Sequence, residues 1–148
     1  MKLKALILAC LTLSPLAYAE TDIMTNHAYA RATPPNAPTS AVFAEFMNKG
    51  DTERHIVSAT TDAAGKVELH DVITEGDVMK MRQIEKITIP AKGKTVLKPG
   101  SLHIMLFDLT KPFVEGDSIN VQVTFANGET QTITAPIKKV MKGMTHHH

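Results

Sequence analysis

Residues 118–137 read SINVQVTFANGETQTITAPI, and they show the pattern of the whole chain most clearly. Two segments rich in Val, Ile, Thr and Phe, Ser118–Phe125 and Gln131–Ile137, flank the dipeptide Asn127-Gly128. Such a composition is typical of β-strands. Asn and Gly both tolerate the positive φ angles of a type I′ turn, which joins neighbouring antiparallel strands. This stretch therefore predicts a β-hairpin with a type I′ turn.

The same arrangement of strands and turns repeats along the chain. Turn signals containing Gly, Asn or Asp separate further segments of this kind, and the other strands are predicted at residues 23–31, 41–48, 66–70, 78–84 and 102–106. No segment keeps a 3.6-residue apolar period for three turns, as a long helix would. We therefore expect an all-β domain, built as a sandwich or a barrel of antiparallel strands.

Residues 1–19 have the features of a secretory signal peptide. Lys2 and Lys4 give a positive start, and residues 5–13 are apolar. Residues 17–19 read Ala-Tyr-Ala, which fits an A-x-A cleavage site. The apolar run is shorter than the ~20 residues that span a bilayer. We expect cleavage before Glu20, export to the periplasm and a mature protein that is not integral to the membrane.

A second interpretation of the leader stays open. Residues 7–10 read Ile-Leu-Ala-Cys and loosely resemble a lipoprotein processing box, which would leave Cys10 acylated at the mature terminus. After the leader, the expected organisation is one binding domain over residues 20–140 and a tail over residues 141–148.

Composition narrows the range of partners. Removing residues 1–19 takes away two of the 16 basic side chains, none of the 15 acidic ones and the single cysteine, so the formal charge changes from +1 to −1. No basic surplus favours nucleic acid or an anionic membrane as a partner. No unusual apolar stripe demands a dimer, and we expect a monomer. In an oxidising compartment, a chain without cysteine is expected to hold a soft metal through methionine and histidine.

Four residues form the candidate metal site. His70, Met81, His103 and Met105 follow the pattern H-x10-M-x21-H-x-M. Two thioethers and two imidazoles form a soft donor set, which suits copper in its reduced state and binds hard cations poorly. Spacing alone leaves an ordinary packing role open, because methionine often fills gaps in a core.

Strand alternation places these donors on shared faces. His103 and Met105 lie opposite the aliphatic residues of 102–106, with Cβ atoms ~7 Å apart after two strand rises. Met79 and Met81 project together in the same way from residues 78–84, and His70 projects on the face opposite Val67 and Leu69. We predict no metal role for four other residues, which have no second donor at ligand spacing: Met24, Met47, His27 and His55.

The chain resembles the periplasmic copper chaperone family called PCu(A)C over nearly its whole mature length. The similarity includes residues 30–35 (ARATPP), 37–42 (APTSAV), 67–70 (VELH), 78–82 (VMKMR), 89–90 (IP) and 98–106 (KPGSLHIML). All four positions and the gaps of the family's copper motif match. Tyr29 stands where the family often has tryptophan, outside that motif.

This resemblance implies a cupredoxin-like Greek-key antiparallel β-sandwich that binds one Cu(I) through His70, Met81, His103 and Met105. It also implies a chaperone that passes copper towards the binuclear copper centre of cytochrome c oxidase, alongside Sco-type thiol proteins. Blue-copper electron-transfer sites use a cysteine thiolate, which the mature chain lacks. Carriage of copper is therefore expected rather than redox cycling or catalysis.

The C-terminal residues offer a second donor set. It comprises Met141, Met144, His146, His147 and His148. Short His-rich tracts bind metals, and similar tails in the family are thought to bind Cu(II) or to assist transfer. Three terminal histidines also suit an expression tag. We expect a natural tail that can hold a second copper as Cu(II).

Three other functions compete with a copper chaperone. A zinc hydrolase would need three strong ligands and an open water position, for which thioethers are poor donors. An accessory β-sandwich would carry the Met/His cluster incidentally. A copper storage or resistance protein would use the same site, and the sequence does not separate it from a chaperone.

Overall fold

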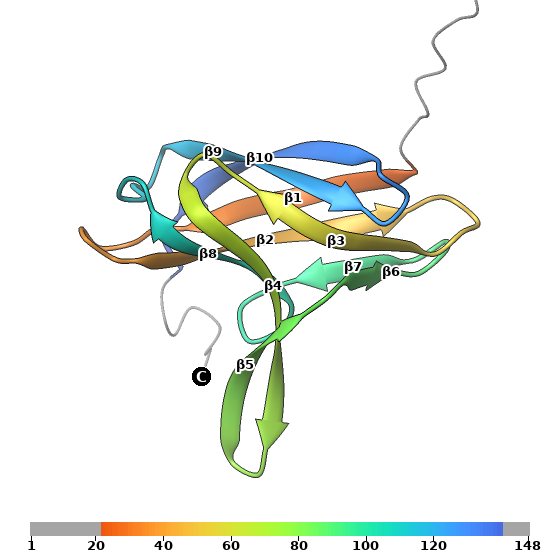
Figure 1. The fold of residues 1–148 in the computed structure, drawn as a ribbon, viewed down its shortest axis with the longest axis horizontal. Helices are drawn as coiled ribbons and strands as arrows, with labels where there is room; N and C mark the ends of the chain where they lie inside the picture. The colour runs from red at the N-terminus through yellow and green to blue at the C-terminus, as the bar shows by residue number, and fades with distance from the viewer. Residues whose placement is uncertain (1–21, 141–148) are drawn as a thin grey trace, which may run out of the picture.

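The structure is a computed structural model that describes residues 22–140. Within that range the chain forms ten strands and no helix (Figure 1). The strands are β1 (Ile23–Arg31), β2 (Thr39–Asn48), β3 (Arg54–Thr60), β4 (Ala64–Glu75), β5 (Val78–Ile84), β6 (Ile87–Ile89), β7 (Lys94–Leu97), β8 (His103–Leu109), β9 (Ser118–Phe125) and β10 (Thr130–Lys138).

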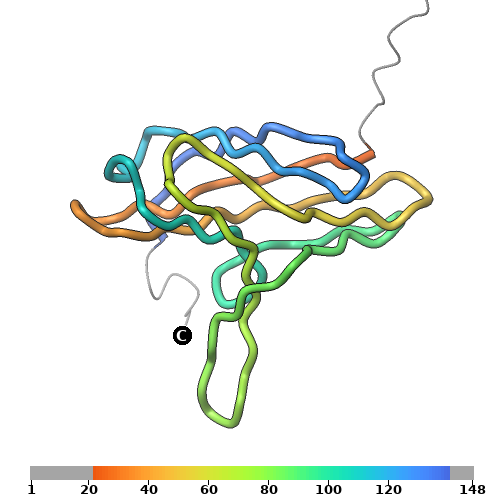
Figure 2. Tube along the Cα trace, in the orientation of Figure 1, coloured from red at the N-terminus to blue at the C-terminus, as the bar shows by residue number. Residues whose placement is uncertain are grey.

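The strands are hydrogen-bonded in the order β5-β4-β8-β2-β1-β10-β9-β3-β6, and β7 pairs with β2 as well. The tube in Figure 2 shows this path folding over into two layers. Some strands that pair in the sheet, such as β2 and β8, are far apart in the sequence. The connections between them cross over, as in a Greek-key sandwich. The predicted all-β sandwich is confirmed. It is antiparallel except where β1 pairs with β10 in parallel, at Ala30 with Ile137 and Arg31 with Lys138.

Alternation along the strands builds the core between the layers. In β9 every second residue is buried, from Ile119 to Phe125, and its neighbour β10 buries Ile133, Ala135 and Ile137. On the opposite layer, β8 buries Ile104 and Leu106. Fully burying one such aliphatic or aromatic side chain contributes about 1.5–3 kcal/mol. The residues between them point outward, and those of β4 and β8 form the face described in the next section.

The predicted hairpin between β9 and β10 is confirmed, but its predicted turn type is wrong. Gly128 has a positive φ of 90°, whereas Asn127 does not have a positive φ. The Gly128 N–H donates to the Phe125 carbonyl at 2.9 Å, and the Phe125 N–H donates to the Glu129 carbonyl at 2.8 Å. The Asn127 side-chain oxygen accepts the Glu129 N–H at 3.0 Å. This local bond lets Asn127 stay at negative φ, so a single left-handed residue closes the loop.

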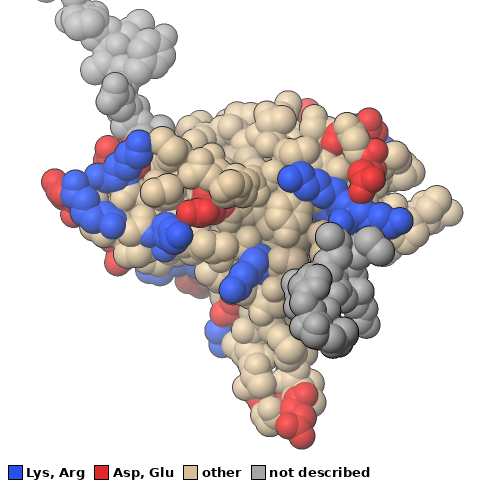
Figure 3. All heavy atoms as spheres, turned by 180° about the vertical axis from the view of Figure 1, so that it is seen from behind, with Lys and Arg blue, Asp and Glu red and all other residues tan. Residues whose placement is uncertain are grey.

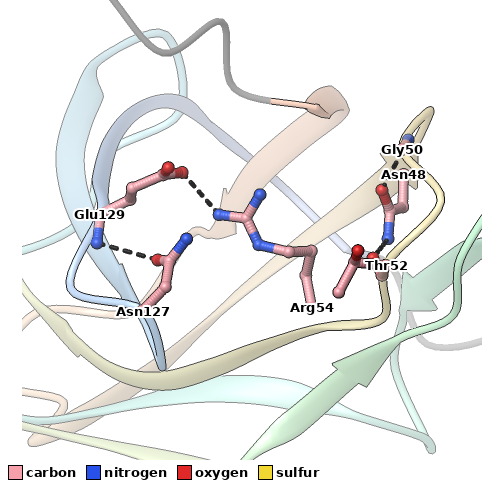
Figure 4. Close-up of polar contacts among 6 residues, drawn as sticks. All are labelled: Asn48, Gly50, Thr52, Arg54, Asn127 and Glu129. Carbon is pink, nitrogen blue, oxygen red and sulfur yellow. Dashed lines mark hydrogen bonds and ion pairs between the residues drawn. The ribbon is translucent and has the colours of Figure 1, made fainter.

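Figure 4 shows the polar contact between this hairpin and the start of β3. The Arg54 guanidinium donates to the Glu129 carboxylate at 2.6 Å and lies over the Phe125 ring. Nearby, the buried Asn48 donates to the Thr52 carbonyl at 2.8 Å. These contacts stabilise the turn end of the sandwich.

One element projects from the sandwich. Residues 69–84 of β4 and β5 pair from Leu69 with Ile84 to Glu75 with Val78, and we call this hairpin the β4–β5 arm. It extends away from the two layers in Figures 1 and 2. The space-filling view in Figure 3 shows acidic side chains at its tip and mostly uncharged surface along its length. Gly76 turns the chain there with a φ of 63°.

Candidate metal centre

Two histidines from different strands face each other at the base of the arm. His70 of β4 and His103 of β8 are direct partners in the ladder, and their ring centroids lie 5.5 Å apart. Their neighbours Leu69 and Ile104 pair on the core side. His70 is 9% exposed and His103 is 5% exposed. The register therefore places two buried imidazoles together, although 32 residues separate them in the sequence.

The two methionines of the motif lie on the same face of the sheet. Met105 follows His103 by two residues in β8 and is half-buried, opposite Glu68 on one side and Ala41 on the other. Met81 of β5 is paired with Val72, which follows His70 by two residues in β4. Because side chains alternate along a strand, all four donors project from one face. Met81 is 59% exposed, so one thioether is open to solvent.

A shallow pocket of about 270 Å³ lies over this face. Met81, His103 and Met105 are among its lining residues, and His70 lies beside it against the His103 ring. The rest of the lining is Arg31, Thr39, Ser40, Ala41, Phe43, Val72, Met79, Pro99 and Gly100. Arg31 carries the only charged side chain in that set, so the pocket is mostly uncharged.

The surroundings of His103 leave one ring nitrogen available. Its Nδ1 lies 2.9 Å from the Ser101 carbonyl oxygen. A carbonyl only accepts, so Nδ1 carries the proton and Nε2 carries the lone pair. Burial lowers the pKa of His103, and the Ser101 contact opposes this shift only in part. The imidazole is therefore neutral at pH 7, the form that binds metals.

In His70, by contrast with His103, the ring nitrogen left available is Nδ1. Its Nε2 lies 2.7 Å from the Glu68 carboxylate. The Lys66 ammonium contacts the second carboxylate oxygen at 3.1 Å. These two hydrogen bonds, the one from His70 first, lower the pKa of Glu68 and keep it ionised. The His70 Nδ1 is buried and has no hydrogen-bond partner among the described residues.

The donor set fits a soft metal ion. An unsatisfied buried polar atom costs about 1–3 kcal/mol, and a bound cation would satisfy the His70 Nδ1. Two imidazole nitrogens and two thioether sulfurs on one face make an S2N2 set, which suits Cu(I). In residues 22–140, no three histidine, cysteine, aspartate or glutamate side chains come together in an arrangement that could hold a metal ion.

Comparison with known proteins places the chain in a family. Residues 23–137 match the profile described as "Putative lipoprotein LpqE-like". This chain belongs to the LpqE-like family. The LpqE-like chain is 33% identical over 100 residues to "Putative lipoprotein Lxx21020" of Leifsonia xyli subsp. xyli, and 25% identical over 99 residues to an uncharacterized protein of Rickettsia prowazekii. It covers 60% and 55% of the length of these two relatives.

Solved structures similar to the LpqE-like chain include PCuAC domains. The copper-bound PCuAC domain from PmoF2 matches with a TM-score of 0.69 at 19% identity, over 83% of this chain and 97% of that one. The Cu(I) form of DR1885 from Deinococcus radiodurans matches with a TM-score of 0.68 at 28% identity, over 86% and 85% of the two chains. The first match shows the shared fold alone, while the second also has related sequence.

Two residues near the site of the LpqE-like chain lie outside the predicted ligand set, and sequence reasoning missed the first of them. Glu68 contacts His70, and the alternation of residues 66–70 already put both side chains on one face. Met79 lines the pocket and is 63% exposed. The sequence predicted that Met79 projects together with Met81 and is at most a substitute ligand, because it lies outside the motif.

The other methionines and histidines lie elsewhere. Met24 and Met47 are direct partners between β1 and β2, so each does have a second thioether beside it, which the sequence analysis did not foresee. An Asn26 amide donates to the Met47 sulfur at 3.4 Å. His55 contacts the Thr88 hydroxyl at 3.0 Å and the Glu53 carboxylate at 3.2 Å. His27 has a φ of 55° at an irregularity of β1.

Two sequence predictions fall outside the described residues. The signal peptide over residues 1–19 is one, and the tail over residues 141–148 with Met141, Met144 and the three histidines is the other. Within residues 22–140, no helix has the length and apolar character needed to cross a bilayer.

Proposed function

We propose that this LpqE-like protein is an exported copper carrier that holds one Cu(I) through His70, Met81, His103 and Met105. The observation that carries the proposal is the convergence of these donors, from three strands, on one face of the sandwich. The two imidazole rings lie together, and the His70 Nδ1 has no hydrogen-bond partner among the described residues. Residues 20–148 contain no cysteine, so a thiolate ligand is not available there. This donor set prefers Cu(I) over harder cations.

The position of the site suits hand-over of the metal rather than catalysis. Met81 lies on the projecting β4–β5 arm and is largely exposed, whereas the two histidines are buried. An acceptor's ligand can therefore replace the exposed thioether first and the imidazoles afterwards. We infer a binding protein with no enzymatic role, acting as a monomer.

The comparisons support this proposal. DR1885, similar in fold and related in sequence, has been solved with Cu(I). The LpqE-like family and the Leifsonia relative both carry names that describe lipoproteins, which fits export. We propose that residues 1–19 are the export signal, that residues 20–140 are the copper-binding domain, and that the acceptors are the binuclear copper centre of cytochrome c oxidase and Sco-type proteins in the periplasm.

Storage or resistance is the alternative use of the same site. A chaperone is expected to release its copper to an apo-acceptor within the time of mixing, whereas a storage protein retains it. Mixing the Cu(I)-loaded protein with an apo Sco-type protein and separating the two by size would distinguish them. Retention of all the copper by this protein would favour storage.

The site itself is tested by anaerobic titration with Cu(I). We expect one equivalent bound with high affinity, by native mass spectrometry, and X-ray absorption with two sulfur and two nitrogen neighbours. A shell of nitrogen and oxygen alone, or no retained Cu(I), would reject the proposed site.

A further inference from the structure

The two histidines of the site contact different kinds of partners through different ring atoms. In His103, Nδ1 faces the Ser101 carbonyl at 2.9 Å. In His70, Nε2 faces the Glu68 carboxylate at 2.7 Å. Both partners are acceptors, so each fixes a proton on the ring atom it contacts. The two rings are consequently held as opposite tautomers.

We propose that Glu68 is a positioning residue that orients His70 with its proton on Nε2, so that copper binds His70 through Nδ1 and His103 through Nε2. This inference rests on the proposed copper site and adds the atoms that bind the metal. The buried and unpartnered His70 Nδ1 is the atom left for a ligand. Carboxylates that accept from the second nitrogen of a histidine ligand commonly fix its tautomer and orientation.

Glu68 is itself held in place by further contacts. Lys66 binds its second oxygen at 3.1 Å and also lies over the Phe107 ring, whose centroid is 5.9 Å from that of His70. Glu68 and Met105 are direct partners between β4 and β8. The carboxylate is thus packed between a cation and a metal-site residue, and its side chain is only 15% exposed. A mobile surface glutamate would not define one ring orientation.

The tautomers can be measured in the metal-free protein. Long-range ¹H–¹⁵N correlation spectra, recorded where the imidazoles are neutral, distinguish protonated from unprotonated ring nitrogens. We expect the proton on Nε2 in His70 and on Nδ1 in His103. Addition of Cu(I), which is diamagnetic, is expected to shift the ¹⁵N signals of His70 Nδ1 and His103 Nε2 most. The opposite tautomer at His70 would overturn the inference.

Variants of Glu68 test its role in binding. Glu68→Leu removes the acceptor, and we expect a mixture of His70 tautomers with a 10- to 100-fold weaker Cu(I) affinity, the range typical for loss of such a partner. Glu68→Gln keeps an acceptor oxygen and is expected to retain most of the affinity. The matched control is Asp71→Asn, because Asp71 is a carboxylate on the same strand that pairs with Arg82 instead.

Two outcomes separate failure of this inference from failure of the copper site. If Glu68→Leu binds Cu(I) as tightly as Asp71→Asn does, Glu68 has no positioning role although the copper site stands. If the unaltered protein binds no Cu(I), both the site and the role of Nδ1 as a donor are rejected, whatever the tautomers. Should Glu68→Leu fail to fold, the spectra of the unaltered protein and of Glu68→Gln still decide the assignment.

Discussion

Methionine and leucine have similar volumes and apolar character, but only methionine has a sulfur lone pair. Replacing both Met81 and Met105 with leucine is expected to cost less than about 1.5 kcal/mol of folding free energy, because neither side chain is fully buried. The variant keeps two imidazoles, which bind Cu(II) as well as Cu(I). We therefore expect Cu(I) affinity to fall far more than Cu(II) affinity in competition titrations.

The matched control for that variant is Met79→Leu, which removes a thioether that also lines the pocket. Met79 lies outside the matched motif and is expected to affect Cu(I) affinity much less. Equal losses in the control and the double variant would show that Met79 is needed as much as the two thioethers of the motif. Unchanged Cu(I) binding in the folded double variant would remove the basis for the site.

Tyr29 gives a pH prediction that does not involve the metal. Burial raises the pKa of this phenol above its usual value of 10.0, and the nearby Arg31 opposes the shift. The unfolded chain therefore loses the proton first as pH rises, so unfolding becomes more favourable from about pH 10 upward. The stability contributed by the neutral phenol is complete below pH 10 and is lost as pH passes the folded pKa.

The measurement is the phenolate absorbance of the folded protein against pH, compared with the same titration in denaturant. Tyr29→Phe should remove the late transition and flatten the decline in unfolding free energy above pH 10. A phenol that titrates at the same pH in both states would contradict the prediction. The chain has two tyrosines, and the other, Tyr18, lies within the proposed export signal and outside the described residues.

At the scale of elements, the β4–β5 arm holds Met81 on the exposed strand β5, and it contributes to the core only at its base, through Leu69 and the partly buried Ile84. Its turn depends on Gly76, whose φ of 63° suits glycine, while a Cβ there would meet no atom within 4 Å. Gly76→Val is therefore strained by conformation alone, by about 1–2 kcal/mol. We expect faster amide exchange along the arm and weaker Cu(I) binding, with little change in the melting temperature of the sandwich.

Gly76→Asn is the matched control, because asparagine adopts the left-handed conformation more easily. It should behave almost like the unaltered protein in both measurements. If Gly76→Val loses stability in the whole sandwich, the arm is not the independent element that its exposed β5 indicates. If Cu(I) affinity is unchanged in a frayed arm, Met81 is not a ligand.

The sequence predicts which side of a strand a residue lies on better than it predicts which residues of distant strands pair. Alternation alone placed His103 and Met105 together and opposite the aliphatic residues of β8, because that relation is local to one strand. It did not predict that His70 faces His103, since register between distant strands depends on the packing of the whole sandwich. The parallel pairing of β1 with β10 is non-local in the same way. Asn127 was assigned the wrong turn because its side-chain hydrogen bond to Glu129 was not considered.

At the scale of the whole molecule, the proposed export leaves two possible forms of the N-terminus. Cleavage after residues 17–19 yields a free chain that begins at Glu20, whereas lipoprotein processing yields an acylated Cys10. We expect the first product, detected by mass spectrometry of the protein isolated from a cell that exports it. A mass increased by fatty acyl groups, with Cys10 as the first residue, would contradict this. If the protein proves to be acylated at Cys10, Cys10→Ser is expected to release it from membranes.

The C-terminal donors form a second copper site in our prediction, separate from the quartet of His70, Met81, His103 and Met105. The described chain ends at Val140, two residues beyond Lys138, whose ladder partner Arg31 lines the pocket that also contains Met81, His103 and Met105. Imidazoles bind Cu(II) well, so deleting residues 141–148 should remove one Cu(II) equivalent and leave one Cu(I) bound.

Replacing His146, His147 and His148 with alanine should have the same effect on Cu(II) as the deletion, while Met141→Leu with Met144→Leu should not. Both copper states are counted by titration and mass spectrometry. An unchanged Cu(II) capacity after deletion would exclude the tail as a copper site. Loss of Cu(I) from the truncated protein would instead mean that the primary site has been placed wrongly, because the quartet on the sandwich face is intact in that variant.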